Sequence, residues 1–234
     1  MKEFKKIRSY QYTLFFGVLL LIVMFLYGCN NSPNYIIAPP PDIDNFGVSA
    51  YSTPDTNDAL AGLLELDSVK ILIKDIKVID QSNGENNFKV GPYVMYLGLN
   101  YFVNTVDTGY IPAGTYDKIK FEIHKPNNND PIPDPEFRDS AGNYSVIAKG
   151  RYNGLPFVYK SNKSAHQFLT LPNEIIVTAI GKTNVTLSVN PYTWFISNGM
   201  YLDPNLPANE NDIDNNIKDS FKAFKDDDKN GIPD

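Results

Sequence analysis

The sequence is poor in the residues that build disulfide frameworks and many catalytic centres. Its 234 residues include one cysteine, Cys29, two histidines, His124 and His166, and one tryptophan, Trp194. A lone cysteine excludes an internal disulfide, which exported proteins normally build from cysteine pairs. The chain also lacks the Gly-x-Ser-x-Gly, phosphate-loop and His-Glu-x-x-His patterns. We therefore expect a protein that is not an enzyme.

Positive charge is also scarce. Lysine and arginine together number 21 against 27 aspartates and glutamates, which gives a formal net charge of −6. The first 28 residues carry four of the basic residues and one acidic residue, so the rest of the chain has a balance near −9. Such an acidic domain lacks the basic surface that nucleic acid requires. It also lacks an electrostatic contact to anionic lipid.

No apolar run reaches the ~20 residues that a membrane-spanning helix needs. The longest, residues 14–27, follows a basic start, which is the layout of a bacterial secretory signal. The tetrapeptide Leu26-Tyr27-Gly28-Cys29 resembles a lipobox, which implies cleavage before Cys29 and attachment of fatty acyl chains to it. The alternatives are an uncleaved signal anchor and an ordinary secretory signal in which Cys29 is incidental.

Composition divides the chain into four segments. Residues 1–28 form the lipoprotein signal peptide. Residues 29–45 contain four prolines and are expected to form an extended linker after the lipidated cysteine. Residues 46–212 carry the strand patterns of a β-sandwich domain, and residues 213–234 form a C-terminal helix with an acidic tail.

Short runs with a two-residue hydrophobic period dominate residues 46–190. The strongest run, residues 63–80, alternates apolar residues with lysines and changes register at Lys74-Asp75, which predicts a strand with a β-bulge. Asn153-Gly154 predicts a tight hairpin. The expected strands span residues 46–52, 63–80, 93–99, 118–124, 144–152, 155–160, 167–171, 174–180 and 184–190. This pattern predicts an all-β fold, an antiparallel β-sandwich of the Ig-like or transthyretin-like kind with a short C-terminal helix.

The predicted helix spans residues 214–225, where Ile217, Phe221 and Phe224 recur at helical spacing. Oxygen-bearing residues then follow in alternation. The expected calcium ligands are Asp226, Asp228, Asn230, the carbonyl of Ile232, and Asp234, with Gly231 at the sharp turn. The segment resembles the first nine residues of an EF-hand loop, or one unit of a thrombospondin-type calcium repeat. Asp219, Asp227 or the terminal carboxylate would complete the cage. The alternative is a solvated acidic tail.

Other candidate residues are isolated in the sequence. Trp194 either stacks on a sugar ring, as a weak ligand-binding residue, or packs in the core. His124 and His166 either stand at strand edges or converge, with a methionine such as Met200, on a metal. The acidic residues of the proline-rich loop 125–140 are expected to be solvated rather than to form a glycosidase-like pair.

Two stretches resemble a family of uncharacterised bacterial lipoprotein domains of unknown function. One is the strand of residues 68–78, and the other is residues 111–121, where Pro112-Ala113-Gly114-Thr115-Tyr116 forms a turn before a strand. The resemblance covers about residues 46–191 and implies an exported β-sandwich. Residues 194–224 are also similar to periplasmic metallophore-binding sandwich proteins, which implies copper binding, although their metal ligands have no match here.

These features predict a lipid-anchored lipoprotein of the bacterial cell envelope, at the outer membrane, facing the periplasm or the surface. Its expected role is a non-catalytic binding or structural module, with calcium as the candidate stabilising ion. Its expected partners are the membrane, through the lipid anchor, and an envelope protein or glycan. The alternative is a periplasmic protein that handles a metal or metallophore.

Overall fold

The computed structural model describes residues 44–53 and 62–234 of the chain. These residues belong to one compact unit that is mostly β-structure. Cys29, the predicted signal peptide and most of the predicted linker lie outside the described residues. Among the described residues, no helix has the length and apolar character needed to cross a membrane.

Strands make up most of the described chain, and short helices lie in the loop after β5 and between β11 and β14. The strands are β1 (Phe46–Ser52), β2 (Leu64–Asp80), β3 (Glu85–Leu97), β4 (Asn104–Gly109), β5 (Gly114–Ile123), β6 (Arg138–Asp139), β7 (Gly142–Asn143), β8 (Val146–Tyr152), β9 (Leu155–Ser161), β10 (Ala165–Val177), β11 (Thr183–Val189), β12 (Ile196–Ser197), β13 (Met200–Tyr201) and β14 (Phe221–Lys225). The helices are α2 (Glu210–Asp219) and the 3-10 turns η2 (Pro135–Phe137), η3 (Pro191–Phe195) and η4 (Pro207–Asn209).

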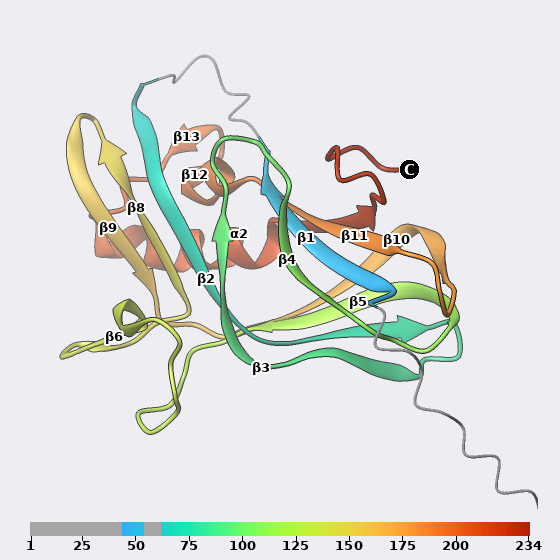
Figure 1. Ribbon diagram of the computed structural model, residues 1–234. Coiled ribbons are helices and arrows are strands. Elements are labelled where there is room, and N and C mark those ends of the chain that lie inside the picture. The colour runs from blue at the N-terminus through green and yellow to red at the C-terminus, as the bar shows by residue number, and fades with distance from the viewer. Residues whose placement is uncertain (1–43, 54–61) are drawn as a thin grey trace, which may run out of the picture. The chain divides into compact units, whose positions relative to one another are not determined.

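Two sheets form the layers of the sandwich (Figure 1). The upper layer is a four-stranded sheet in the order β14-β11-β1-β4, and the lower layer is a six-stranded sheet in the order β10-β5-β2-β8-β9, with β3 also paired to β2. Within the two layers all pairs are antiparallel except β1 with β11, which run parallel. The predicted all-β sandwich is therefore confirmed, with one parallel pair that the sequence pattern did not indicate.

The long strand β2 organises the six-stranded sheet. Its register against β3 shifts between Ile73 and Asp75, which confirms the predicted bulge at Lys74-Asp75. Such a bulge bends a strand and lets it pair with different partners along its length. Accordingly, β2 pairs with β8 through its first half and with β5 through its second half.

The core lies between the two layers. Alternate residues of β2, β5, β1 and β11 face each other there, and Val48, Ile71 and Phe121 are among those almost fully buried. The predicted turn before β5 is confirmed, since Tyr116 is buried and its hydroxyl donates to the carbonyl of Pro112 at 2.8 Å. Burial of this apolar surface is the main source of stability in a sandwich without disulfides.

Several predicted elements need correction. The runs 167–171 and 174–180 form one strand, β10, whose register against β5 shifts between Thr170 and Ile175. The run 93–99 is the end of the longer strand β3, and β4 was not predicted. In β4 the polar sequence Asn-Thr-Val-Asp-Thr-Gly gives no hydrophobic alternation, because this edge strand has no fully buried residue.

The predicted helix over residues 214–225 is wrong in its position. The helix α2 covers Glu210–Asp219, and the residues after Ser220 form β14, which pairs antiparallel with β11. Phe221 packs edge-to-face on Phe121, with ring centroids 5.3 Å apart. A free edge on β11 and this aromatic contact outweigh the local helical spacing, since tertiary packing routinely overrides propensity.

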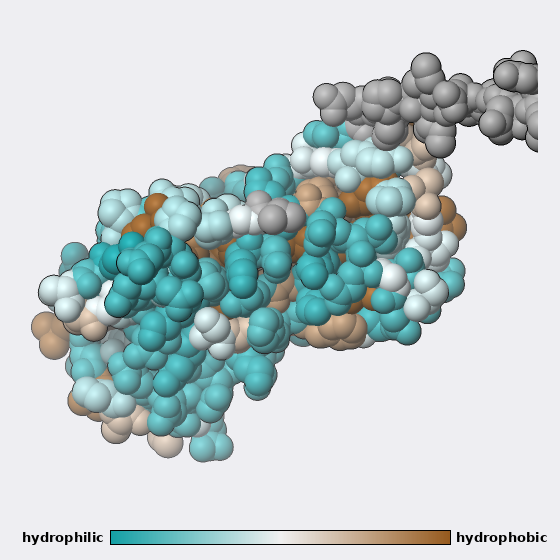
Figure 2. Space-filling view, turned by 90° about the horizontal axis from the view of Figure 1, so that it is seen from below, coloured by the Kyte–Doolittle hydropathy of each residue, from teal (hydrophilic) through white to brown (hydrophobic). Residues whose placement is uncertain are grey.

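One face of the domain is largely hydrophilic. Seen from below, the domain shows mainly hydrophilic side chains, with hydrophobic ones in narrow streaks (Figure 2). On the outer side of the six-stranded sheet Lys77 and Lys120 both contact Glu85, each at 2.8 Å. The proline-rich loop after β5 is tied to this sheet through Phe137, which is buried against Leu72.

Candidate metal site

Residues 226–234 form a closed loop that follows β14. The backbone N–H of Asp234 donates to the carbonyl of Lys225 at 3.1 Å, which closes the loop at its base. The carboxylate of Asp234 accepts from the backbone N–H of Asp227 at 2.7 Å and from the Lys225 ammonium at 3.1 Å. These bonds hold the pKa of Asp234 below its ordinary value, the backbone N–H of Asp227 contributing most. The tail is therefore a built structure and not a frayed end.

The first residue of this loop, Asp226, is completely buried, with 0% of its surface exposed. Its carboxylate accepts from the Thr186 hydroxyl at 2.7 Å, and from the backbone N–H groups of Asn230 at 2.9 Å and Gly231 at 3.1 Å. Asp226 thus attaches the loop to β11 and shapes the turn within it. All three of its donors are neutral groups.

A row of buried polar side chains on β11 and β1 supports Asp226 from below. The Asn184 amide donates to the Thr186 hydroxyl at 3.1 Å and to the backbone carbonyl of Asp226 at 3.0 Å. Its own oxygen accepts from the Ser49 hydroxyl at 3.0 Å. The packing leaves no room for a side chain at Gly47, whose added Cβ would lie 2.9 Å from the Asn184 Oδ1. The outer face of the four-stranded sheet is therefore polar and covered by the loop (Figure 1).

The turn of the loop is set by two residues with positive φ, Lys229 at 57° and Gly231 at 80°. Asp228 accepts from the Asn230 backbone N–H at 3.2 Å and from its side-chain amide at 2.8 Å. The Asn230 oxygen accepts from the backbone N–H of Ile232 at 2.7 Å. The Lys229 ammonium donates to the Thr105 hydroxyl of β4 at 2.9 Å.

Three carboxylates converge within this loop. One oxygen of each of Asp226, Asp228 and Asp234 lies within 4.8 Å of the others, so the three side chains could hold an ion. Of the other predicted ligands, Asn230 and Ile232 belong to the same loop, with the Asn230 oxygen bound to the Ile232 N–H. Asp227 points elsewhere, since it accepts from the Asn184 backbone N–H at 2.9 Å and pairs with Lys225 at 2.6 Å.

Charge in the loop is unbalanced. Lys225 pairs with Asp227 and Asp234, and the hydrogen bond to Asp227 is the main reason why the pKa of Lys225 is raised. Asp226 and Asp228 form no ion pair with any described residue. A buried carboxylate is costly unless a cation or metal compensates its charge. The arrangement therefore favours a cation beside Asp226.

Trp194 is buried in the core and does not face a ligand. None of its surface is exposed, and its indole N–H donates to the Ser220 hydroxyl at 2.8 Å. A ring buried in this way has no face open to a sugar, so the packing alternative describes Trp194 correctly.

The two histidines lie near Glu122 on the six-stranded sheet, where His124 contacts its carboxylate and His166 stands across from it on the neighbouring strand. The His124 Nδ1 lies 3.0 Å from Glu122 Oε1, and its Nε2 lies 3.7 Å from Asp130 Oδ2. His166 is the cross-strand partner of Glu122 in the pairing of β10 with β5, which places both side chains on one face. Burial alone raises the pKa of Glu122, but the His124 hydrogen bond and the nearby charges of Lys74 and His166 bring it below the ordinary value. Met200 does not join this group, because it lies exposed in the β12–β13 hairpin.

Three of the four acidic residues of the proline-rich loop are paired with lysines, and the fourth, Asp130, lies beside His124. Lys70 contacts Asp134 at 2.7 Å and Glu136 at 2.8 Å, and Lys160 contacts Asp139 at 2.7 Å. Lys70 lowers the pKa of Asp134, Lys149 and then Lys70 lower that of Glu136, and Lys160 lowers that of Asp139. A general acid needs a raised pKa instead.

Sequence reasoning missed Asn184, Thr186 and Ser49 as parts of the site. Their only signal in the sequence is the alternation of polar and apolar residues along each strand, which predicts that the polar side chains face water. In the structure the C-terminal loop covers that face, and nothing in the strand sequences indicates that a loop packs there.

The fold and the site define a class: a β-sandwich protein with an acidic C-terminal loop docked on its outer face. No protein-family model matches the chain, and no curated protein matches it. Among solved structures it is similar to MbnP from Methylosinus trichosporium, with 11% sequence identity and a TM-score of 0.41 over 71% of this chain and 86% of that chain. At this identity and TM-score the likeness assigns no ligand to the chain.

Proposed function

We propose that this chain is a non-catalytic metal-binding module of the bacterial cell envelope, in which calcium occupies the C-terminal loop. The observation that carries the proposal is the buried carboxylate of Asp226, which accepts hydrogen bonds from neutral donors only. Its two nearest acidic neighbours in the loop, Asp228 and Asp234, add negative charge at the same point. A bound cation compensates this charge, as buried charges in proteins require.

The donor set favours calcium over softer metals. Every candidate ligand in the loop is an oxygen, and calcium takes six to eight hard oxygen ligands in flexible geometry. Three aspartates, the carbonyl of Ile232 and water molecules supply such a set. An open, partly hydrated site of this kind is expected to bind in the range of ~10⁻⁴–10⁻³ M that extracellular modules show.

The location in the envelope rests on the sequence. The secretory layout and the lipobox-like ending at Cys29 favour a lipid anchor, and the acidic domain fits an aqueous compartment beside the membrane. The non-catalytic role is supported by the lysine pairs that keep the loop carboxylates ionised.

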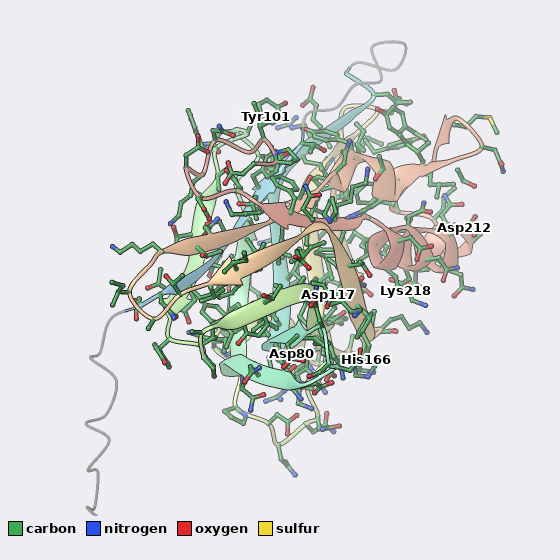
Figure 3. All side chains as sticks on the ribbon, turned by 90° about the vertical axis from the view of Figure 1, so that its right-hand side faces the viewer. Asp80, Tyr101, Asp117, His166, Asp212 and Lys218 are labelled. Carbon is green, nitrogen blue, oxygen red and sulfur yellow. The ribbon has the colours of Figure 1, made fainter. Side chains whose placement is uncertain are left out.

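Calorimetric titration of the full chain with calcium tests the proposed site. We expect one site, and Asp228→Asn should weaken binding about ten-fold or more, because a ligand charge is lost. Asp212→Asn is the matched control, since Asp212 lies exposed on α2 away from the loop (Figure 3). At a calcium concentration ten times Kd the folded state should gain about 1.4 kcal/mol. An absence of both heat and stabilisation with the native chain would remove the site.

A second candidate function is the handling of a transition metal, for which His124 and Glu122 supply an imidazole and a carboxylate in contact, with His166 across from Glu122 on the neighbouring strand. Imidazole and carboxylate ligands suit zinc and copper. Glu122 contacts the Nδ1 of His124, which fixes the orientation of the ring as carboxylates do beside metal-bound histidines.

Titration with Cu²⁺ in the presence of saturating calcium separates the two candidates. If the histidines bind copper, His124→Ala and His166→Ala should each lower the affinity about ten-fold or more, whereas Met200→Leu should not. Equal copper binding by the native chain and the three variants would exclude His124 and His166 as copper ligands and leave calcium as the proposed ion.

A further inference from the structure

A cavity of about 200 Å³ opens beside the C-terminal loop. Its walls come from the start of β11, the end of β4, the start of β1 and the loop itself. The loop contributes Asp227 and Lys229, β4 contributes Thr108, and Lys182 stands directly before β11; Asp44 also lines the cavity. This volume is about seven times the ~30 Å³ share of one water molecule in the liquid, which is room for a single sugar residue.

The cavity carries ammonium groups without acidic partners. Lys182 and Lys229 form no ion pair within the described ranges, and Lys229 instead donates to a neutral hydroxyl, that of Thr105, at 2.9 Å. The acidic residues at the rim are already engaged, because Asp227 pairs with Lys225 and Asp44 accepts from the Thr108 hydroxyl. Two lysines that line one cavity and have no acidic partner favour an anionic group between them.

The same lining can also bind hydroxyl groups. Carboxylates such as Asp44 and Asp227 are acceptors with several lone pairs, so they can take further hydrogen bonds from a ligand that donates. A ligand that offers one carboxylate and several hydroxyls therefore matches both the ammonium groups and the carboxylates. Neither a simple anion nor a neutral sugar uses both.

The same backbone segment, residues 226–229 of the C-terminal loop, contributes to both the candidate metal site and the cavity. Asp226 and Asp228 turn their carboxylates toward the candidate ion, whereas the intervening Asp227 and the next residue, Lys229, line the cavity. An ion that holds Asp226 and Asp228 in place also fixes the backbone that presents Lys229. Binding at the two places is therefore expected to be coupled, and coupling of this kind is reciprocal.

We infer that this cavity binds the carboxylate and hydroxyl groups of a single sugar-acid residue, between Lys182 and Lys229, and that loading of the neighbouring loop with calcium strengthens this binding. The coupling rests on the proposed function, whereas the cavity itself does not. The ligand is a sugar residue that carries a carboxylate and hydroxyl groups, either at the end of an acidic glycan chain or within its repeating unit.

The test is a titration of the ¹⁵N-labelled full chain with sodium glucuronate, followed by NMR, with calcium present. The backbone signals of Lys182 and Lys229 should shift to saturation. Lys182→Met should weaken binding about ten-fold or more through loss of one charge-assisted contact. The control, Lys222→Met, changes an exposed lysine of β14 that does not line the cavity. Glucose and acetate, which each offer half of the ligand, should bind more weakly than glucuronate.

The outcomes separate this inference from the proposed function. Equal binding of glucose or acetate, or full binding by Lys182→Met, would overturn the sugar-acid assignment even if calcium binds. Glucuronate binding that depends on Lys182 but is the same with calcium and with EDTA would support the cavity and overturn the coupling. If calorimetry then also detects no calcium, the proposed function fails while the cavity remains.

Discussion

At the scale of single residues, Asp226 joins the C-terminal loop to the sheet. Its carboxylate binds a β11 hydroxyl and two loop N–H groups while fully buried. Without metal, Asp226→Ala should lower the free energy of unfolding by about 2–4 kcal/mol, because it leaves buried donors without an acceptor. Asp228→Ala should change it by less than about 0.5 kcal/mol, since Asp228 is exposed. Urea unfolding in EDTA measures both, and similar values for the two variants would refute the assigned role of Asp226.

Asp234 makes closure of the loop sensitive to acid. Its pKa is lowered from 3.8, first by the backbone N–H of Asp227 and then by Lys225. A lowered pKa means that closure is fully favoured above pH 3.8 and is lost as the pH falls through the folded-state value. The amide signal of Asp227 should therefore titrate with a midpoint below 3.8, and Asp234→Asn should abolish that titration. A midpoint at or above 3.8 would show that the loop is open.

At the scale of elements, β14 is the strand whose apolar residues have helical spacing and which was therefore predicted to be part of a helix. Phe221 and Ala223 face the core while Lys222 is exposed. Phe221→Ala should cost about 3–5 kcal/mol of unfolding free energy, as for other buried phenylalanines. Lys222→Ala should stay within about 0.5 kcal/mol. Thermal or urea unfolding of the two variants checks this, and a loss of stability in Lys222→Ala matching that of Phe221→Ala would argue against the strand.

Which elements the sequence predicts depends on where their partners lie. The β2 bulge and the Tyr116 turn were predictable because short-range patterns determine them. The start of α2, the strand β14 and the edge strand β4 were not, since their form depends on residues far along the chain. For the site, the alternating aspartates predicted the loop, but the burial of Asp226 under Thr186 follows from the packing of the tail on β11.

At the scale of the whole molecule, the expected lipid anchor decides where the domain works. We expect the native chain to partition into the detergent phase, because several acyl chains on Cys29 give stable membrane binding. Cys29→Ser removes the acceptor thiol, so the variant should stay in the aqueous phase once its leader is cleaved. Detergent phase separation with mass analysis of the N-terminus measures both. A serine variant that stays with membranes and keeps its leader would support the signal-anchor alternative.

The central claim is that the acidic loop on the outer face of the sandwich holds a divalent cation. Anomalous diffraction from crystals grown with calcium tests it most directly, because it locates the ion independently of any binding assay. The account predicts a single strong peak about 2.3–2.6 Å from oxygens of Asp226, Asp228 and Asp234. A loop that keeps the same closed form in saturating calcium, with no peak among these three carboxylates, would contradict it.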